Sequence, residues 1–354
     1  MQPFLDFLTA DFLSKDVWIW FAFIGAVGAL LAFDLGVVNK KDHEIGIKES
    51  LSLSAFYIAI GIGFSAIIWA LYNNASATAS IDPQLLAVSG ADRAWTAVQL
   101  YLTGFAVEKT LALDNVFVIS LVFTYLAIPR IYQHRVLFWG IIGVIVLRAL
   151  MIGLGAVLVS QFSWILYVFG AFLIFTGLMM LRKDDAAEDM SQNKVLLWLK
   201  RQMNVTPELH GNRFRVQLPD PKTGKLRWVA TPLLLALLFV EIVDVIFAVY
   251  SVPAIFALTS DPYIVYTSNI FAILGLRALF FALSAMVHRF HYLKYALAAT
   301  LVFIGSKIFL GDFFENGKFP ALWSLGITMG LIGSGIVYSL WKTRSGATKD
   351  APAT

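Results

Sequence analysis

Nine ionisable side chains lie inside the long apolar stretches of this 354-residue chain, and five of them are acidic. They are Asp34, Glu108, Lys109, Asp114, Arg148, Glu241, Asp244, Arg277 and Lys307. A charge at the centre of a membrane helix costs about 2.5–3.5 kcal/mol on insertion scales, so such groups pair with one another or line a polar cavity. Carboxylates grouped in this way can bind cations or protons.

Helical spacing groups most of the acids at one depth. Glu108 and Asn115 are seven residues apart and share a helix face, as do Glu241 and Asp244 at three apart. Asp114 and Asp244 each lie about twelve residues from a predicted cytoplasmic helix end, near the middle of the membrane. We predict a metal site at this depth, formed by Asp114, Asn115, Glu108, Asp244 and Glu241.

The basic residues at membrane depth have a structural interpretation. Arg148, Arg277 and Lys307 are expected to neutralise the acids while the site is empty. Lys109 is grouped with these basic residues because it lies in the same apolar stretch as Glu108 and Asp114. Asp34 lies near the end of its own stretch, where it can cap a helix turn or take part in cation access.

The available residue types restrict the ligand chemistry. The chain contains no cysteine, and its five histidines all lie in polar connections. Oxygen ligands therefore remain at membrane depth, and they favour hard divalent cations such as Mn²⁺, Mg²⁺ or Ca²⁺ over Zn²⁺ or Cu⁺. The motifs His-Glu-x-x-His and Gly-x-Ser-x-Gly are absent as well, so we expect no enzyme activity and no prosthetic group.

Membrane helices must position these residues. Hydrophobic residues make up 59% of the chain and the mean hydropathy is +0.75, which excludes an ordinary soluble domain. A transmembrane helix needs about 20 apolar residues. We predict an all-α polytopic membrane protein with about nine spans, centred on residues 17–37, 52–72, 97–126, 136–159, 162–181, 231–256, 264–287, 295–311 and 321–341.

The distribution of Lys and Arg predicts the orientation. Alternate connections, namely 38–51, 127–135, 182–230, 288–294 and 342–354, hold 20 of the 27 basic residues, and the other connections hold three. The positive-inside rule then places the N-terminus outside and the C-terminus in the cytoplasm. Because the formal net charge is only +4, we expect the bilayer and a metal cation as partners, and no nucleic acid.

The spans form two halves joined by one long loop. Residues 1–181 hold spans one to five, residues 231–341 hold spans six to nine, and residues 342–354 form a cytoplasmic tail. In the loop 182–230, the amphipathic segment after Asn193 predicts a helix at the membrane surface, and an alternating pattern around residues 219–224 predicts a β-hairpin. This loop is interpreted either as a tether or as a regulatory element.

Three anchors in register indicate an internal repeat. Asp-x-x-Phe occurs in spans three and six, Leu-Arg-Ala-Leu in spans four and seven, and Phe-x-Gly in spans five and eight. Since spans three and six run in opposite directions, the three-helix repeat of spans 3–5 and 6–8 is inverted. Many secondary transporters have this architecture and bind substrate at the repeat interface, although duplication without transport is the alternative.

At these residues the chain resembles the TerC family of bacterial membrane proteins. The matching segments begin at Phe33, Glu108, Glu241, Ser251 and Asp261, and the resemblance covers residues from about 20 to 310. The family is associated with tellurite resistance, alkaline response and manganese export. The resemblance therefore implies Mn²⁺ efflux across the bacterial inner membrane, with Mn²⁺ as substrate, and this agrees with the oxygen-ligand argument.

One position departs from the family pattern. After Phe247 the family reads Ala-Val-Asp-Ser, whereas this chain has Tyr250 in place of the acid. Tyr250 lies six residues after Asp244 and is expected beside the predicted site. Its phenol either fills space that a cation would occupy or packs in the core with its hydroxyl on a carboxylate.

Two classes of function remain. The first is a divalent-cation exporter, which needs coupling because moving two charges against an inside-negative potential costs about 4.6 kcal/mol per 100 mV. Proton antiport through the same carboxylates is the simplest coupling. The second class is a non-transporting scaffold or assembly factor in which the buried acids form permanent ion pairs with the basic residues.

Overall fold

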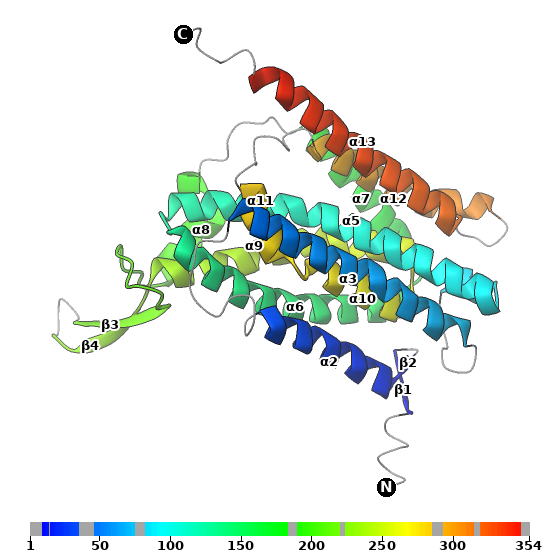
Figure 1. The fold of residues 1–354 in the computed structure, drawn as a ribbon, viewed down its shortest axis with the longest axis horizontal. Helices are drawn as coiled ribbons and strands as arrows, with labels where there is room; N and C mark the ends of the chain where they lie inside the picture. Colours follow the sequence, from blue (N-terminus) through cyan, green and yellow to red (C-terminus); the bar gives the residue numbers. More distant parts are fainter. Residues whose placement is uncertain are drawn as a thin grey trace.

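The computed structural model describes residues 9–13, 15–34, 46–74, 82–182, 190–219, 224–284, 293–314 and 319–347. In this part of the chain, long helices pack side by side, and two short β-hairpins lie near opposite ends of the bundle (Figure 1). The hairpin of β3 and β4 projects from the bundle, and the hairpin of β1 and β2 precedes the first long helix.

The elements follow in three groups. The first half contains β1 (Asp11–Phe12), β2 (Lys15–Asp16), α2 (Val17–Phe33), α3 (Ile47–Asn73), α4 (Pro83–Leu86), α5 (Gly90–Tyr125), α6 (Arg130–Gln161) and α7 (Ile165–Arg182). The loop contains η2 (Met190–Gln192), α8 (Lys194–Gln202), β3 (Arg215–Pro219) and β4 (Leu226–Ala230). The second half contains α9 (Pro232–Leu258), α10 (Pro262–Ile273), α11 (Leu276–Ser284), α12 (Leu293–Leu310), η4 (Gly311–Phe313) and α13 (Ala321–Ala347).

All nine predicted spans fall on helices, and the prediction of an all-α polytopic membrane protein is confirmed. Among the described residues, six helices are long and apolar enough to cross a membrane, and α10 with α11 adds a seventh if this bent pair is one span. Two predicted spans differ in character from these. Helix α2 has only 17 residues, and α5 contains Glu108, Lys109 and Asp114.

The seventh predicted span, 264–287, is not one continuous helix. Helices α10 and α11 meet at a bend of 53°, and between them Gly275 has a φ of +81°, which favours glycine. Helix α9, in contrast, continues through Pro253. The bend leaves the last carbonyl groups of α10 without helical partners, and the Lys109 ammonium donates to two of them, on Ala272 at 3.0 Å and Leu274 at 3.3 Å. Lys109 therefore caps the end of α10.

Helices α7 and α12 pack backbone against backbone through glycines. A Cβ atom built on Gly177 would lie 2.7 Å from the Ala298 carbonyl oxygen, and one built on Gly305 would lie 2.6 Å from the Gly170 carbonyl oxygen. Gly177 and Gly305 are the third anchor of the repeat. Ala298, which Gly177 meets, lies seven residues before Gly305, and Gly170, which Gly305 meets, lies seven residues before Gly177. A twofold axis between the halves would produce such reciprocal contacts. The inverted orientation of the repeat stays a prediction.

We expect Gly177→Ala to lower the thermal stability of the purified protein, because the new methyl group would overlap the α12 backbone and force the helices apart. Overpacking of this kind costs about 1–3 kcal/mol. The matched control is Gly330→Ala on α13, where a Cβ atom meets nothing within 4 Å. The control should be as stable as the parent or more stable, since alanine favours helices over glycine. Equal melting temperatures for both variants would contradict the packing argument.

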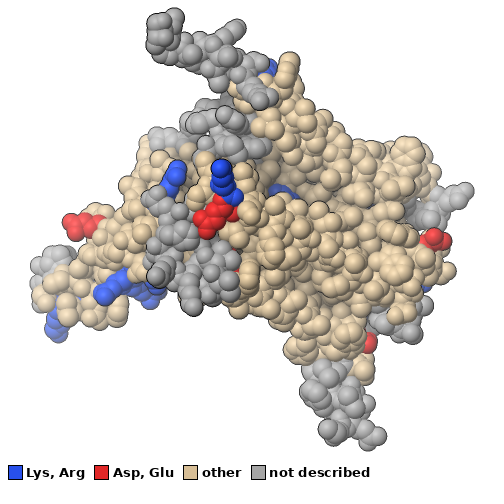
Figure 2. Space-filling view, in the orientation of Figure 1, with Lys and Arg blue, Asp and Glu red and all other residues tan. Residues whose placement is uncertain are grey.

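The loop between the halves contains the helix and hairpin that its sequence patterns predict. Asn193 caps α8 by accepting from the backbone N–H groups of Val195 and Leu196, and Leu196 and Leu199 are buried. Strands β3 and β4 pair antiparallel from Arg215 opposite Ala230 onward. In Figure 2, blue basic side chains gather over this hairpin, while most of the surface over the long helices carries no charged side chain.

Candidate functional site: a buried guanidinium between two carboxylates

Arg148 is the centre of a buried polar cluster near the middle of the bundle. It lies on α6, it is 1% exposed, and its partners come from α5, α9 and α10. On α9, Asp244 is the thirteenth of 27 residues, so the cluster lies halfway along that helix. The depth of the cluster in the membrane stays a prediction.

The guanidinium bridges two acidic residues. Its Nε and Nη2 atoms donate to the two carboxylate oxygens of Asp244 at 3.2 and 3.0 Å, which is a bidentate ion pair. Its Nη1 atom donates to the Glu108 carboxylate. The two acids are 4% and 0% exposed, so both ion pairs are shielded from solvent. The basic residue thus separates the acids that were predicted to share a cation.

Two neutral polar side chains complete the coordination of Arg148. The Nη1 atom also lies 3.2 Å from the Ser251 hydroxyl on α9 and 3.2 Å from the Asn269 amide oxygen on α10. The Asn269 amide nitrogen then donates to the second carboxylate oxygen of Glu108 at 3.0 Å. Each oxygen that faces Arg148 is therefore of a type that can also ligate a hard cation.

The charges of the cluster do not balance. One guanidinium faces two carboxylates, so ionised Glu108 and Asp244 leave an excess of one negative charge beside Arg148. A proton or a metal cation would compensate this excess, and an unpaired charge at this depth is costly. The cluster can therefore accept further positive charge.

A small cavity adjoins the cluster on one side. It has a volume of about 40 Å³, and its polar lining consists of Asn115 and Asp244. The Asn115 amide nitrogen donates to Asp244 at 2.9 Å, while the Asn115 amide oxygen is buried without a hydrogen-bond partner. A water needs about 10–15 Å³ of such space, so the cavity can hold a few waters or one partly hydrated ion. The remaining lining is apolar and includes Leu137 and Phe280.

Glu241 lies one helical turn before Asp244 on α9. A Cβ atom on Gly143 of α6 would overlap its carboxylate, so a glycine is what makes room for the acid between the two helices. One carboxylate oxygen, Oε2, is buried without a hydrogen-bond partner. Asn115 thus presents an unsatisfied oxygen beside Asp244, and Glu241 presents one at the contact of α9 with Gly143.

The other predicted residues lie at different places. Lys307 is buried and donates to Ser324 at 3.3 Å, which ties α12 to α13, and Asp34 is buried at the end of α2. The structure does not describe the side chains of Asp114 and Arg277, so their predicted roles lie outside the described part. The structure brings Asn115, Glu108 and Asp244 together around Arg148, with Glu241 beside them.

Tyr250 lies away from the cavity. It packs against an apolar cluster that includes Val107 of α5, Leu173 of α7 and Leu297 of α12, with its ring edge-on to Phe247 at 5.4 Å. It is not among the residues that line the cavity at Asp244. Tyr250 therefore packs where α9 meets α5, α7 and α12.

Sequence reasoning missed Ser251 and Asn269. Both are neutral, and single Ser and Asn side chains are too common in helices to indicate a site. An asparagine within an apolar stretch was the available signal, since its amide needs hydrogen-bond partners at membrane depth. Among the described residues, no three His, Cys, Asp or Glu side chains are grouped as a metal site, because Arg148 lies between the acids.

Comparisons with known proteins identify the family. Residues 93–347 match the model of the integral membrane protein TerC family. The chain is 42% identical over 335 residues to an uncharacterized membrane protein of Myxococcus xanthus, STKORF319, covering 95% of this chain and 96% of the relative. It is 43% identical over 321 residues to an uncharacterized membrane protein of Rickettsia felis, covering 91% and 97%.

A further relative carries a more specific name. The chain is 40% identical over 324 residues to Alx of Escherichia coli strain K12, covering 91% of this chain and 94% of the relative, whose name gives it provisionally as a membrane-bound redox modulator. No solved structure matches the chain. From the family model and these relatives, the chain belongs to the TerC family of integral membrane proteins.

Proposed function

We propose that this protein is a secondary transporter that exports divalent cations, most suitably Mn²⁺, across the bacterial inner membrane. One observation supports the proposal: a buried cluster halfway along α9 in which one guanidinium faces two carboxylates, beside a small cavity with an unsatisfied amide oxygen. In transporters, charged residues at this depth mark ion pathways. The resemblance to manganese exporters points to Mn²⁺ among the hard cations.

Asp244 is the proposed primary ligand, because it faces both the guanidinium and the cavity. The Asn115 amide oxygen supplies a neutral ligand from α5, and Glu241 supplies a second carboxylate from α9. Glu108 joins the site when Arg148 moves away from it. Asp114, next to Asn115 in the chain, remains a proposed ligand.

The proposed role of Arg148 is to occupy the site in place of a cation. Its guanidinium contacts carboxylate, hydroxyl and amide oxygens, which are the groups that would ligate Mn²⁺. An empty site with unpaired acids would be costly in the membrane. A tethered cation removes this cost and can be displaced by a divalent ion.

Proton antiport is the proposed coupling. The excess negative charge of the cluster can be balanced by a proton in one state and by a metal ion in another. Export then proceeds by exchange of protons for Mn²⁺ at the same carboxylates. Manganese efflux from proteoliposomes should accelerate when a pH gradient is imposed at a fixed membrane potential, and an efflux indifferent to that gradient would rule out this coupling.

A second candidate function is that of a non-transporting membrane scaffold or stress factor. The observation in its favour is the burial of both ion pairs of Arg148, as expected for permanent structural pairs. The name of the relative Alx suggests redox modulation, and this chain, which has no cysteine, could contribute to it only without a thiol of its own.

Calorimetric titration of the purified protein with Mn²⁺ distinguishes the two candidates. A transporter site predicts saturable binding that Ca²⁺ or Mg²⁺ competes for more weakly. Permanent ion pairs predict only the heat of dilution, and that result would reject the transport proposal.

A further inference from the structure

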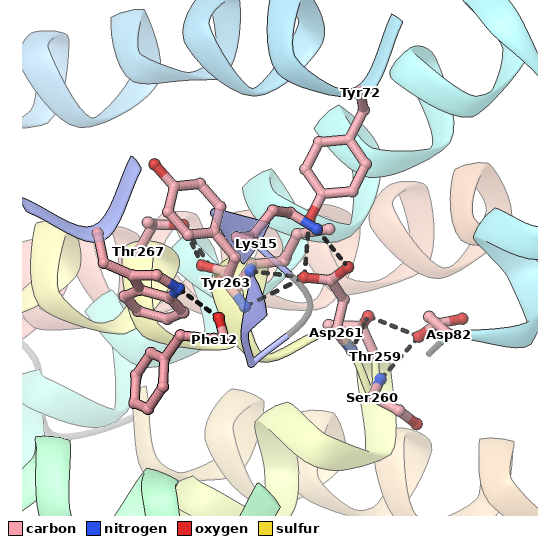
Figure 3. A network of polar contacts seen from close by, with 11 residues as sticks. Phe12, Lys15, Tyr72, Asp82, Thr259, Ser260, Asp261, Tyr263 and Thr267 are labelled. Carbon is pink, nitrogen blue, oxygen red and sulfur yellow. Dashed lines mark hydrogen bonds and ion pairs between the residues drawn. The ribbon is translucent and has the colours of Figure 1, made fainter. Parts of the chain in front are cut away.

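A second buried polar cluster lies near the end of the bundle opposite the α8–β4 loop. It consists of Lys15, Tyr72, Asp82, Thr259 and Asp261, which we call the outer cluster (Figure 3). All five residues are at most 1% exposed. They come from β2, the end of α3, the residue before α4, and the connection between α9 and α10, so the cluster joins four separate parts of the chain.

Asp261 has two roles in the outer cluster. One oxygen, Oδ1, accepts the backbone N–H groups of Tyr263 and Ile264 at 3.1 and 3.2 Å, so Asp261 caps the N-terminus of α10. The same oxygen accepts the Tyr72 hydroxyl at 2.7 Å. The other oxygen, Oδ2, faces the Lys15 ammonium at 3.5 Å, and this ammonium also lies 4.6 Å from the centre of the Tyr72 ring.

Asp82 holds the same connection from another side. Its Oδ2 atom accepts the Thr259 hydroxyl at 2.6 Å and the backbone N–H of Ser260 at 2.7 Å. Figure 3 shows Asp82 and Lys15 reaching the connection from different elements, with Asp261 between the lysine and Thr259. The junction of α9 and α10 is thus fixed by Asp82 and by the Lys15–Asp261 pair together.

The position of this junction relates the outer cluster to the central site. Helix α9 supplies Asp244 and Ser251, and α10 supplies Asn269. Asn269 follows Asp261 by eight residues, which is about 12 Å along a helix. Any opening between the central site and this end of the bundle must separate groups that the outer cluster holds together.

Open space lies on the other side of the central site. The cavity at Asn115 and Asp244 is lined by Leu137, which precedes Arg148 on α6, and by Val240, which precedes Asp244 on α9. Both helices start at the loop end, so the cavity extends toward that end. The structure therefore has space on the loop side of the site and a buried ion pair on the opposite side.

We propose that the Lys15–Asp261 pair closes the path between the central site and the membrane face nearest β1 and β2, and that it separates when a cation leaves on that face. The inference rests on the proposed transport function. The ammonium–carboxylate distance of 3.5 Å exceeds the 2.7–2.9 Å of strong charged hydrogen bonds. Burial of the two charges carries a desolvation cost of its own, so water that enters on separation returns part of the lost attraction.

The absence of cysteine from the chain permits a direct accessibility test. Ser251→Cys places one thiol in the central site, and a membrane-impermeant thiol reagent reports its exposure from each membrane face. Labelling of a separate Leu86→Cys protein identifies which membrane face carries the outer cluster. Leu86 is exposed and lies at the end of α4, four residues after Asp82. The readout needs neither metal binding nor transport.

Two further substitutions, each made in the Ser251→Cys protein, remove the charge attraction. Each leaves the partner charge buried without its counter-ion, which favours entry of water. Asp261→Asn keeps an oxygen that can cap α10, since asparagine is an effective N-cap. Lys15→Met keeps the length of the apolar stem. We expect each substitution to raise the labelling rate of the introduced thiol at least ten-fold from the outer-cluster face. The two substitutions together should raise the rate by no more than either one alone, because both act on one pair.

The control is Asp92→Asn, which removes an exposed carboxylate from the first turn of α5 at the same end of the bundle. Its labelling rate should equal that of the parent. If the charge variants do not fold, Tyr72→Phe tests the same closure by deleting one hydrogen bond to Asp261, with a smaller expected increase. Unchanged labelling in the folded variants would overturn the closure. A parent protein that binds no Mn²⁺, with labelling still raised in the variants, would overturn only the transport function.

Discussion

Asp244→Asn is expected to weaken Mn²⁺ binding at least ten-fold, which corresponds to about 1.4 kcal/mol. The substitution keeps the shape of the side chain and removes its formal charge. Asp244 is the residue that contacts both Arg148 and Asn115 and also lines the cavity, so no neighbouring acid can replace it. Titration of the purified variant with Mn²⁺ measures the effect.

The fold of this variant should survive, because Arg148 retains the Glu108 carboxylate as its counter-ion. Gel filtration and thermal unfolding check this point. The matched control is Asp92→Asn, an equal loss of charge at an exposed position on α5, which should bind Mn²⁺ like the parent. A folded Asp244→Asn protein with parental affinity would show that the metal binds elsewhere.

Arg148→Met is expected to destabilise the metal-free protein by about 3–5 kcal/mol, because it leaves two buried carboxylates without their shared partner. Methionine retains much of the length of the arginine stem, so lost packing contributes little. We expect a marked loss of folded protein in membranes and a lower melting temperature in detergent. Arg93→Met, at the start of α5, is the control for removal of an arginine outside the cluster.

Manganese should partly rescue the Arg148→Met protein. If the guanidinium occupies the cation site, its removal frees carboxylate oxygens for the metal, and ligand binding stabilises the folded state by mass action. The rise in melting temperature on adding Mn²⁺ should therefore be larger for Arg148→Met than for the parent protein. An equal or smaller rise would indicate that Arg148 is a structural counter-ion only, as the scaffold function requires.

The helical architecture was largely predictable because the membrane restricts spanning segments to long apolar helices. The nine apolar segments all became helices, and α8 and the β3–β4 hairpin formed where their periodicities placed them. The break in the seventh segment was not predicted. Pro253 lies inside α9 without ending it, and the bend occurs instead at Gly275. Neighbouring groups can accommodate a proline in a membrane helix, whereas a positive φ favours glycine.

The candidate site was predictable in its charges and less so in its arrangement. Acids at membrane depth must find partners, so the pairing of Arg148 with Glu108 and Asp244 follows from the cost of burying each alone. The sequence could not show that Lys109 would instead cap α10, because that role depends on a bend in a distant helix.

The outer cluster was missed for a different reason. Lys15 and Asp261 lie 246 residues apart and both fall in connections outside the apolar segments, where charges carry no burial cost. Their burial arises only when the β1–β2 hairpin and the α9–α10 connection pack against the end of α3. Tertiary packing therefore gives these two residues an environment that local sequence does not indicate.

In the proposed function, Asp244 and its neighbours carry a divalent cation across the membrane. The most direct test is Mn²⁺ flux in proteoliposomes, with the parent protein, Asp244→Asn and Asp92→Asn reconstituted at equal density. We expect flux above that of empty liposomes for the parent and for Asp92→Asn, and flux at the empty-liposome level for Asp244→Asn. Parent flux equal to that of empty liposomes, or undiminished flux through Asp244→Asn, would contradict transport through Asp244.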